Sequence, residues 1–341
     1  MDTHLLAVGT ALPGPALDNS VLARLFQVGE AWEQWVEAFI GTRTRHLSVN
    51  LETGEVEQWL ADLGATAGTR ALSSAGVEPG EIDLLVMGTS SPDQLMPATV
   101  NMIADRLGID DVPSYQLQSG CSGALQALDV ARQLLLAGRH ETALVLGGDV
   151  CAKQYDLSVD PRQLPQAELV NAVMFGDGAG AVVLSRTPRD GSVVLREVRV
   201  RLAGAGRPSG HMVDWFGVAD RKSLRSGTTE DYKAIEELVP LLAVDVFGEL
   251  LAELDWKPED LDYLLPPQLS GRMTARIVQA LAVPGAAEIS CVRDTGNTGN
   301  ALPFFQLERL LPQMTLGQRA VAVAVESSKW IKSGFALEKV S

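Results

Sequence analysis

The sequence predicts an α/β protein, and two patterns together with the composition support that class. Apolar runs that suit buried strands, such as residues 84–88 and 143–148, alternate with helical patterns such as residues 124–136. Alternation of this kind predicts buried strands in a sheet that helices cover. Of the 341 residues, 46% are hydrophobic and 21% are charged, which is ordinary for a soluble enzyme with a sizeable core.

The second pattern is a weak internal repeat. Residues 83–90 resemble residues 262–269, and each segment follows an acidic helix end. From the first residue of each segment, 38 residues lead to Cys121 and 35 lead to Asn297. Two similar halves would place one strand-to-helix turn from each at a common centre. Chance similarity is the alternative, because α/β proteins reuse such patterns.

The predicted halves are residues 1–186 and residues 187–341, with the Pro- and Gly-containing residues 187–192 as the turn between them. Residues 203–229 are rich in Gly, Arg and Ser and include Trp215. They are predicted to form a long surface insertion of the kind that often gates a site. An irregular connection anchored by aromatic side chains is the alternative.

Charge and cysteine content restrict the partners. The formal net charge of −15 disfavours nucleic acid and anionic membranes, because both would repel the protein. The first residues lack the basic region of a signal peptide, and no run approaches roughly 18 apolar residues, so we expect a cytoplasmic protein. The three cysteines are too few for a disulfide framework, and no residue spacing predicts a metal site.

Cys121 is the candidate nucleophile. It lies in a Gly-Cys-Ser-Gly turn, residues 120–123, just before a helical pattern. Unpaired N–H groups and the positive end of the helix dipole at such a turn would lower the pKa of the thiol and hold an oxyanion. An inert buried thiol is the alternative. Cys151 and Cys291 lack this setting and are predicted to be core residues.

Two further segments are rich in glycine. In residues 175–184 the glycines precede a predicted strand instead of a helix, which indicates a structural turn and not a phosphate-binding loop. Residues 296–301 begin a second predicted helix, where Asn297 takes the place that Cys121 has in the first half. The Asn297 side chain could cap that helix or donate its amide N–H to a substrate carbonyl.

Together these segments resemble the ketoacyl synthase III family across nearly the whole chain. The resemblance implies a thiolase-like, duplicated five-layered αβαβα fold and a homodimer. It also implies acyl loading onto the cysteine from acyl-CoA or from the phosphopantetheine of an acyl carrier protein, with no permanently bound cofactor. The family's Cys-His-Asn constellation is matched by Cys121 and Asn297. The segments that carry the resemblance are residues 41–45, 88–93, 120–123, 175–181 and 296–298.

The third member of that constellation is missing. Where the family has Pro-His-Gln, residues 266–268 read Pro-Pro-Gln, and Pro267 offers no acid, base or hydrogen-bond donor. His211 lies far away in sequence, in the insertion, from which it could reach a site. Near the C-terminus a Val-Glu-Ser-Ser run replaces the family's glycine-rich turn. Glu326 and Ser328 are therefore candidates for side chains at the reaction centre, with a solvated or structural role as the alternative.

These departures change the predicted reaction. Decarboxylative condensation needs two donors on the malonyl thioester carbonyl, and only Asn297 remains. Losing one such donor typically costs about 3 kcal/mol, or roughly a factor of 100 to 1,000 in rate. We therefore predict an acyltransferase that moves an acyl group through acyl-Cys121 to a small acceptor or a second carrier, in polyketide or related secondary metabolism.

Two other functions stay open at this point. One is a synthase that still condenses, with Glu326 or Ser328 in place of the histidine, and the other is a catalytically silent subunit that pairs with an active ketosynthase. In the acyltransferase, Glu326 is the candidate base that deprotonates the acceptor. Its pairing with Lys329, or the capping of a turn, is the alternative.

Two basic clusters could bind an acidic carrier protein or the phosphates of CoA. One contains Arg43 and the other contains Arg221, and Trp215 lies shortly before the second. A solvated surface is the alternative for each cluster.

Overall fold

The structure is a computed structural model that describes residues 2–154, 166–214 and 227–340. Within these residues, ten strands form one hydrogen-bonded sheet. The strands of its first half are β1 (His4–Ala11), β4 (Leu84–Thr89), β5 (Ser114–Gln118), β6 (Thr142–Asp149) and β7 (Gly178–Ser185). Those of its second half are β8 (Val193–Leu202), β11 (Tyr263–Leu265), β12 (Ala287–Glu288), β13 (Arg319–Glu326) and β14 (Ile331–Glu338).

The two halves of the sheet repeat one another. The strand order is β5-β4-β6-β7-β1 and then β8-β14-β13-β11-β12, so equivalent strands lie at equal distances from the β1–β8 junction. In the first half β4 pairs parallel with β5 and β6, and β6 pairs antiparallel with β7. In the second half β11 pairs parallel with β12 and β13, and β13 pairs antiparallel with β14. The predicted duplication is confirmed.

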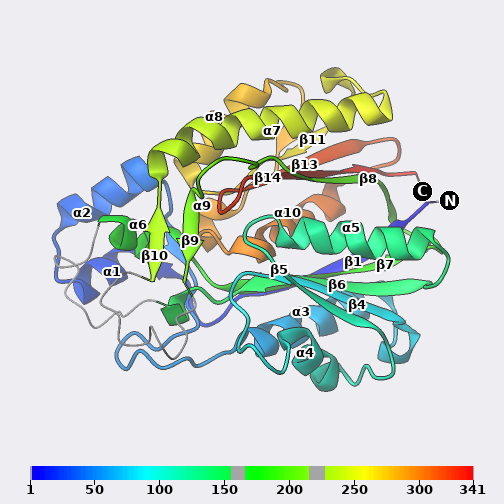
Figure 1. The fold of residues 1–341 in the computed structure, drawn as a ribbon, viewed down its shortest axis with the longest axis horizontal. Coiled ribbons are helices and arrows are strands. Elements are labelled where there is room, and N and C mark those ends of the chain that lie inside the picture. Colours follow the sequence, from blue (N-terminus) through cyan, green and yellow to red (C-terminus); the bar gives the residue numbers. More distant parts are fainter. Residues whose placement is uncertain (1, 155–165, 215–226, 341) are drawn as a thin grey trace.

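Helices form three layers that alternate with the two halves of the sheet (Figure 1). One pair packs on the outer face of the first half, a second pair lies between the halves, and a third pair covers the second half. Both faces of the sheet are thus covered, which is why the predicted strands read as continuous apolar runs. The thiolase-like five-layered αβαβα fold is confirmed. The pairs are α3 (Leu60–Ala75) with α4 (Thr99–Leu107), α5 (Gly123–Leu136) with α10 (Leu302–Leu310), and α7 (Tyr232–Leu254) with α8 (Gly271–Leu281).

Shorter elements gather at one end of the layers (Figure 1). Part of the predicted insertion at residues 203–229 forms a two-stranded hairpin, and residues 215–226 lie outside the described part of the chain. None of the described helices is long and apolar enough to cross a membrane. The shorter elements are β2 (Leu17–Asp18), α1 (Asn19–Leu25), α2 (Glu30–Trp35), β3 (Thr44–Arg45), α6 (Gln166–Met174), β9 (His211–Val213), β10 (Thr228–Glu230) and α9 (Val292–Thr295).

Candidate active site

Cys121 lies in the turn between β5 and α5, where the two halves of the chain meet. The glycines on either side allow the second half to approach closely. A Cβ atom on Gly120 would lie 1.9 Å from Glu326 Oε2, and one on Gly123 would lie 2.6 Å from Asn300 Oδ1. The glycine-flanked turn that the sequence singled out is therefore required by packing against the second half.

Asn300 holds the start of α5 in place. Its Oδ1 accepts the backbone N–H of Ala124 at 2.8 Å, and its Nδ2 donates to the Ser119 carbonyl at 3.1 Å. Nδ2 also donates to Asp149 Oδ2 at 2.9 Å. A side chain of the second half thus caps the helix that follows Cys121 and orients the turn that contains this cysteine.

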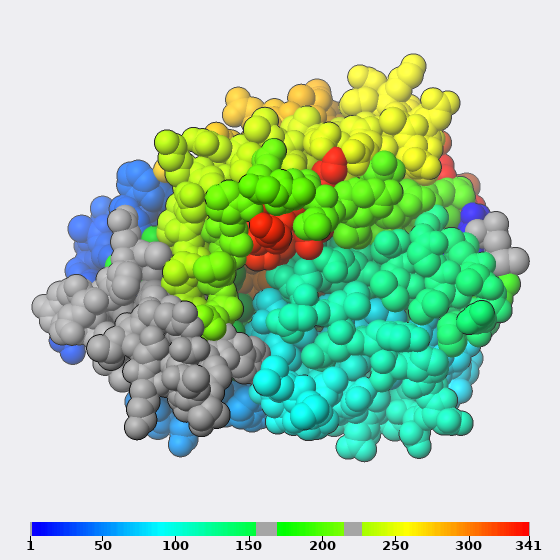
Figure 2. Space-filling view, in the orientation of Figure 1, coloured from blue at the N-terminus to red at the C-terminus, as the bar shows by residue number. Residues whose placement is uncertain are grey.

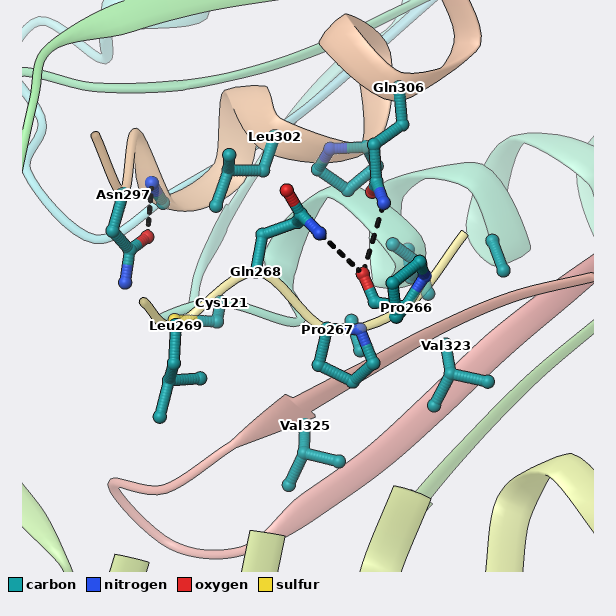
Figure 3. A pocket seen from close by; sticks show the side chains of 15 residues that line it. Cys121, Pro266, Pro267, Gln268, Leu269, Asn297, Leu302, Gln306, Val323 and Val325 are labelled. Atoms are coloured by element: carbon teal, nitrogen blue, oxygen red, sulfur yellow. Dashed lines mark hydrogen bonds between the residues drawn. The ribbon is translucent and has the colours of Figure 1, made fainter. Parts of the chain in front are cut away.

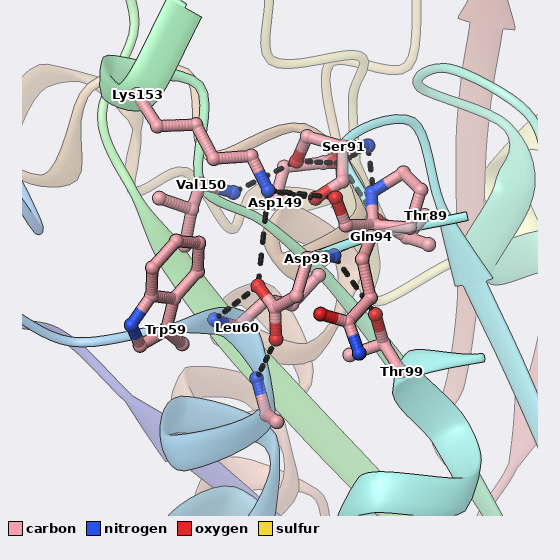
Figure 4. Close-up of polar contacts among 12 residues, drawn as sticks. Trp59, Leu60, Thr89, Ser91, Asp93, Gln94, Thr99, Asp149, Val150 and Lys153 are labelled. Atoms are coloured by element: carbon pink, nitrogen blue, oxygen red, sulfur yellow. Dashed lines mark hydrogen bonds and ion pairs between the residues drawn. The ribbon is translucent and has the colours of Figure 1, made fainter. Parts of the chain in front are cut away.

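Asp149, at the end of β6, ties this turn to the chain that follows β4 (Figure 4). Its Oδ1 accepts the backbone N–H and hydroxyl groups of Ser90 and Ser91 at 2.8 to 3.1 Å. Its Oδ2 accepts the Asn300 backbone N–H at 2.8 Å. A buried carboxylate with this many donors holds three loops in one arrangement around Cys121.

Two cavities meet at Cys121. The first is narrow, about 20 Å³, and contains Asn297 and Pro267 among mainly apolar neighbours (Figure 3). The second is about 600 Å³ and contains Glu326, Ser328 and His211. The structure therefore brings all the predicted reaction-centre residues into the two cavities that share the Cys121 side chain. Other residues around the larger cavity are Ser90, Leu95, Gln118, Asp149, Cys151, Phe175, Val213 and Thr228.

Asn297 is buried, and a hydrogen bond fixes the orientation of its side-chain amide. Its Oδ1 accepts the Gly299 backbone N–H at 3.0 Å, which leaves the Nδ2 group on the side that faces Cys121 (Figure 3). The segment is held to the first half, because the Asn297 backbone N–H donates to the Met174 carbonyl at 2.9 Å. The helix α10 begins only at Leu302, after a short 3-10 turn. Asn297 therefore caps a turn and not the helix predicted to begin there, and its N–H remains available to a substrate.

Pro267 forms an apolar wall beside Asn297 and Cys121 (Figure 3). Its neighbour Gln268 points elsewhere, because its Oε1 accepts the backbone N–H groups of Cys291 and Val292 at 2.8 and 2.9 Å. Neither residue supplies a proton or a donor where the resemblance places a histidine.

Glu326 ends β13 beside Gly120 and is buried. Its Oε1 accepts the backbone N–H of Ser328 at 2.7 Å, so this oxygen caps the β13–β14 turn. Its Oε2 is buried and has no hydrogen-bond partner among the described residues. Lys329, the alternative ion-pair partner, donates to the Arg207 carbonyl at 2.7 Å. One carboxylate oxygen thus has a structural role, and the other is unpaired at the larger cavity.

The expected depression of the Cys121 pKa was wrong. Burial raises the pKa of this thiol well above its usual range, and the negative charges of Glu326, Asp149 and Glu230 raise it further. The start of α5 does not offset these effects, because burial and the charges of three carboxylates outweigh it. Cys121 therefore rests as a neutral thiol at neutral pH, and its proton must leave before or during attack on an acyl donor.

The other two cysteines differ from one another. Cys291 is buried among apolar side chains, as predicted for a core residue. The same prediction for Cys151 was wrong, because this residue lies at the larger cavity together with Cys121. Burial and the charges of Asp149 and Asp177 raise the Cys151 pKa well above its usual range, so it is a weak competitor as a nucleophile.

Arg43, the predicted donor-binding residue that the structure describes, does not join this site. Arg43 lies at a separate cavity of about 330 Å³ with Arg272 and Arg293, and it pairs with Asp294 at 3.5 Å. Arg45 of the same cluster is fully buried and donates to Asn19 Oδ1 and the Val173 carbonyl, each at 2.8 Å, so this member is structural and not a solvated surface residue. The candidates Trp215 and Arg221 lie outside the described residues.

Sequence reasoning assigned no role to Asp149 or Glu230. Asp149 had a usable signal, since it follows the predicted strand at residues 143–148, whose carboxyl end reaches the site. Glu230 had none, because its place at the site follows from the pairing of β9 with β10.

Comparisons with known proteins agree with this geometry. The family described as 3-Oxoacyl-[acyl-carrier-protein (ACP)] synthase III matches residues 115–200, and its C-terminal counterpart matches residues 251–327. Beta-ketoacyl-[acyl-carrier-protein] synthase III 3 of Streptomyces coelicolor is 30% identical, over 94% of this chain and 92% of that protein.

Two solved structures extend the likeness. One, described as "AbyA1 - tetronic acid condensing enzyme", superposes with a TM-score of 0.95 at 59% identity and covers 98% of this chain and 99% of its own. The priming beta-ketosynthase of the R1128 polyketide biosynthetic pathway has a TM-score of 0.83 at 26% identity and covers 99% of this chain and 98% of its own. With the duplicated fold and the Cys121 turn, these matches show that the chain belongs to the ketoacyl synthase III family.

Proposed function

We propose that this protein is a condensing enzyme of secondary metabolism that loads an acyl group onto Cys121 and transfers it to an acceptor to build a ring of the tetronic acid type. The observation that carries the proposal is the position of Cys121 between a large cavity and a narrow apolar cavity that offers the Asn297 amide and no histidine. The 59% identity to a tetronic acid condensing enzyme supports the product class.

The chemistry of such a ring suits the missing histidine. A tetronic acid is a cyclic ester with a 1,3-dicarbonyl unit, so its assembly from thioesters needs one C–acyl bond and one O–acyl bond. A carbon between two carbonyls loses a proton far more readily than a simple thioester, and no carbon dioxide needs to leave. One donor such as the Asn297 amide can then suffice for the enolate, whereas malonyl decarboxylation relies on two.

The proposed steps balance as follows. The Cys121 sulfur attacks the donor thioester, the thiol of CoA or of the carrier leaves, and the Cys121 proton accompanies it. The deprotonated carbon or hydroxyl of the acceptor then attacks the acyl carbon, the C–S bond breaks, and the Cys121 thiolate is released. The proton of the acceptor passes to a base at the larger cavity, where Glu326, the base that the sequence suggested, has an unpaired Oε2.

Simple transfer to an oxygen, nitrogen or sulfur acceptor, as the sequence predicted, shares the first step. The two reactions differ only in the bond formed in the second. The proposal includes a thioester of a carrier protein or of CoA as the acyl donor. It also includes a homodimer, which size-exclusion chromatography with light scattering tests.

Intact-protein mass spectrometry tests the proposal. Incubation with acyl thioesters should add one acyl mass to the parent and to Cys291→Ala, but not to Cys121→Ala. A β-ketoacyl thioester should then be added as the acceptor, together with an acyl donor that contains a hydroxyl group. This acceptor should remove the acyl group from Cys121 and give a product with a new C–C bond. An ester or amide without that bond would support the simple acyltransferase, and absence of any adduct would support the catalytically silent subunit.

A further inference from the structure

A histidine and a carboxylate lie on the β9–β10 hairpin at the edge of the larger cavity. His211 and Glu230 are directly opposite one another in this pair of strands. His211 Nδ1 lies 3.0 Å from Glu230 Oε1, and the Glu230 side chain is only 2% exposed. His211 lines the same cavity as Cys121, and Glu230 is near enough for its charge to raise the pKa of the Cys121 thiol.

The 3.0 Å contact between His211 Nδ1 and Glu230 Oε1 assigns the tautomer of the neutral imidazole. A carboxylate only accepts, so Nδ1 must carry the proton that it shares with Glu230. The lone pair of the ring is then on Nε2. This atom is buried and has no hydrogen-bond partner among the described residues. A buried imidazole nitrogen without a partner is costly to maintain for structure alone, which points to a ligand that completes it.

The hairpin is attached firmly to the reaction centre. The Gly210 backbone N–H donates to the Ser327 carbonyl at 3.0 Å, and the Asp231 N–H donates to the Gly210 carbonyl at 2.7 Å. A Cβ atom on Gly210 would lie 2.6 Å from the Trp330 ring, so glycine is needed for this approach. In Figure 2 the yellow-green residues of this region border the red residues of the β13–β14 turn. His211 is thus held next to the turn that contains Glu326.

We propose that His211 is the general base for the acceptor, oriented by Glu230, and that it supplies from the hairpin the proton-transfer function missing at Pro267. This inference rests on the proposed transfer through acyl-Cys121. Nε2 takes the proton of the acceptor as the acceptor attacks the acyl carbon. The C–S bond breaks, and the proton returns from Nε2 to the departing Cys121 thiolate. Glu326 is then left to cap the β13–β14 turn, and the Glu230 carboxylate stabilises the imidazolium that forms.

The role of His211 can be tested without knowledge of the natural substrates. p-Nitrophenyl acetate acetylates an accessible thiol without carrier recognition, and water then serves as the acceptor. Peptide mapping locates the acetyl group on Cys121, and intact-mass measurements follow its loss. His211→Ala and His211→Asn should slow hydrolysis by about 100-fold or more, because general-base catalysis typically contributes at least that much. Added imidazole should restore part of the rate in His211→Ala.

Three controls complete the design. Hydroxylamine needs no base, so it should discharge acetyl-Cys121 at the same rate in all folded variants. His140→Ala removes another half-buried histidine that lies 3.9 Å from a carboxylate, Asp83, and it should hydrolyse at the parent rate. Glu230→Gln should slow hydrolysis, and combined with His211→Ala it should be no slower than His211→Ala alone, because Glu230 acts through the imidazole.

Hydrolysis at the parent rate in both His211 variants would overturn the inference, and slow hydrolysis confined to Glu326→Gln would move the role to Glu326. Failure of the proposed function has a different signature. Acetyl-Cys121 would form and hydrolyse with the expected dependence on His211, but acyl thioesters would give no adduct and no transfer product.

Discussion

Asn297 provides the sharpest test of how the narrow cavity works. Replacing it with Ala removes two interactions of different kinds. The bond from the Gly299 N–H to Oδ1 is structural, and its loss should reduce the free energy of unfolding by about 1 kcal/mol. The Nδ2 group is the proposed donor to the acceptor enolate, and its loss should raise the barrier by about 3 kcal/mol, a factor of roughly 100 to 1,000 in rate.

Two assays measure these effects separately. Urea denaturation gives the change in stability. Single-turnover reaction of acetyl-Cys121 with the N-acetylcysteamine thioester of acetoacetate gives the rate of C–C bond formation, and acetylation by p-nitrophenyl acetate gives the rate of loading. Asn297→Ala should load at nearly the parent rate and condense roughly 100- to 1,000-fold more slowly.

Thr298 offers a matched control. It is fully buried next to Asn297, and its hydroxyl has no hydrogen-bond partner among the described residues. Thr298→Val keeps the shape and removes an unsatisfied group, so it should keep both rates and be at least as stable as the parent. The reasoning fails if Asn297→Ala condenses at the parent rate, or if loading and condensation fall equally.

Three further outcomes are expected. Glu326→Gln removes a negative charge that raises the Cys121 pKa, so alkylation of Cys121 by iodoacetamide at a fixed pH near 8 should become faster; a slower reaction would show that the carboxylate assists the thiol. Burial raises the pKa of Asp177 from 3.8 to about 6, so the folded state favours the protonated form of this side chain. The resulting contribution to the free energy of unfolding is lost as the pH rises through about 6. Compared with Asp177→Asn, the parent should lose up to about 3 kcal/mol of unfolding free energy between about pH 4 and pH 7 in urea titrations, and parallel curves would contradict this. Because Pro267 donates nothing, release of labelled carbon dioxide from a malonyl thioester should stay well below about 1 per second, and a faster release would show that another group stabilises that enolate.

Local patterns were enough to predict the strands, the central helices and the glycine-flanked turn that contains Cys121. A run such as residues 143–148 is apolar at successive positions only if both faces of the strand are covered, and β6 has that environment. The Gly-Cys-Ser-Gly turn was recognisable from its two glycines. The structure gives the reason for them, because a side chain at either position would collide with the second half. The duplication was also predictable, because both halves contain similar buried strands at similar spacing along the chain.

Electrostatic properties could not be obtained in this way. The pKa of Cys121 depends on Asp149, Glu230 and Glu326, which are 28, 109 and 205 residues away along the chain. A helix start alone predicts a lower pKa, and only the tertiary arrangement shows that carboxylates and burial outweigh it. Cys151 was misassigned for the same reason, because its exposure to the cavity depends on loops from both halves.

The sequence by itself determined the fold class, the duplicated halves, the glycine-flanked Cys121 and the absence of a histidine at Pro267, because each of these is written in local composition and spacing. The tertiary structure decided which distant groups meet at the two cavities: the Asn297 amide, the Glu326 carboxylate and His211, which contacts Glu230. Their meeting depends on how two halves of one sheet enclose α5 and α10 and on how a hairpin attaches to the β13–β14 turn. Such contacts join residues far apart in the chain, and no local pattern encodes them.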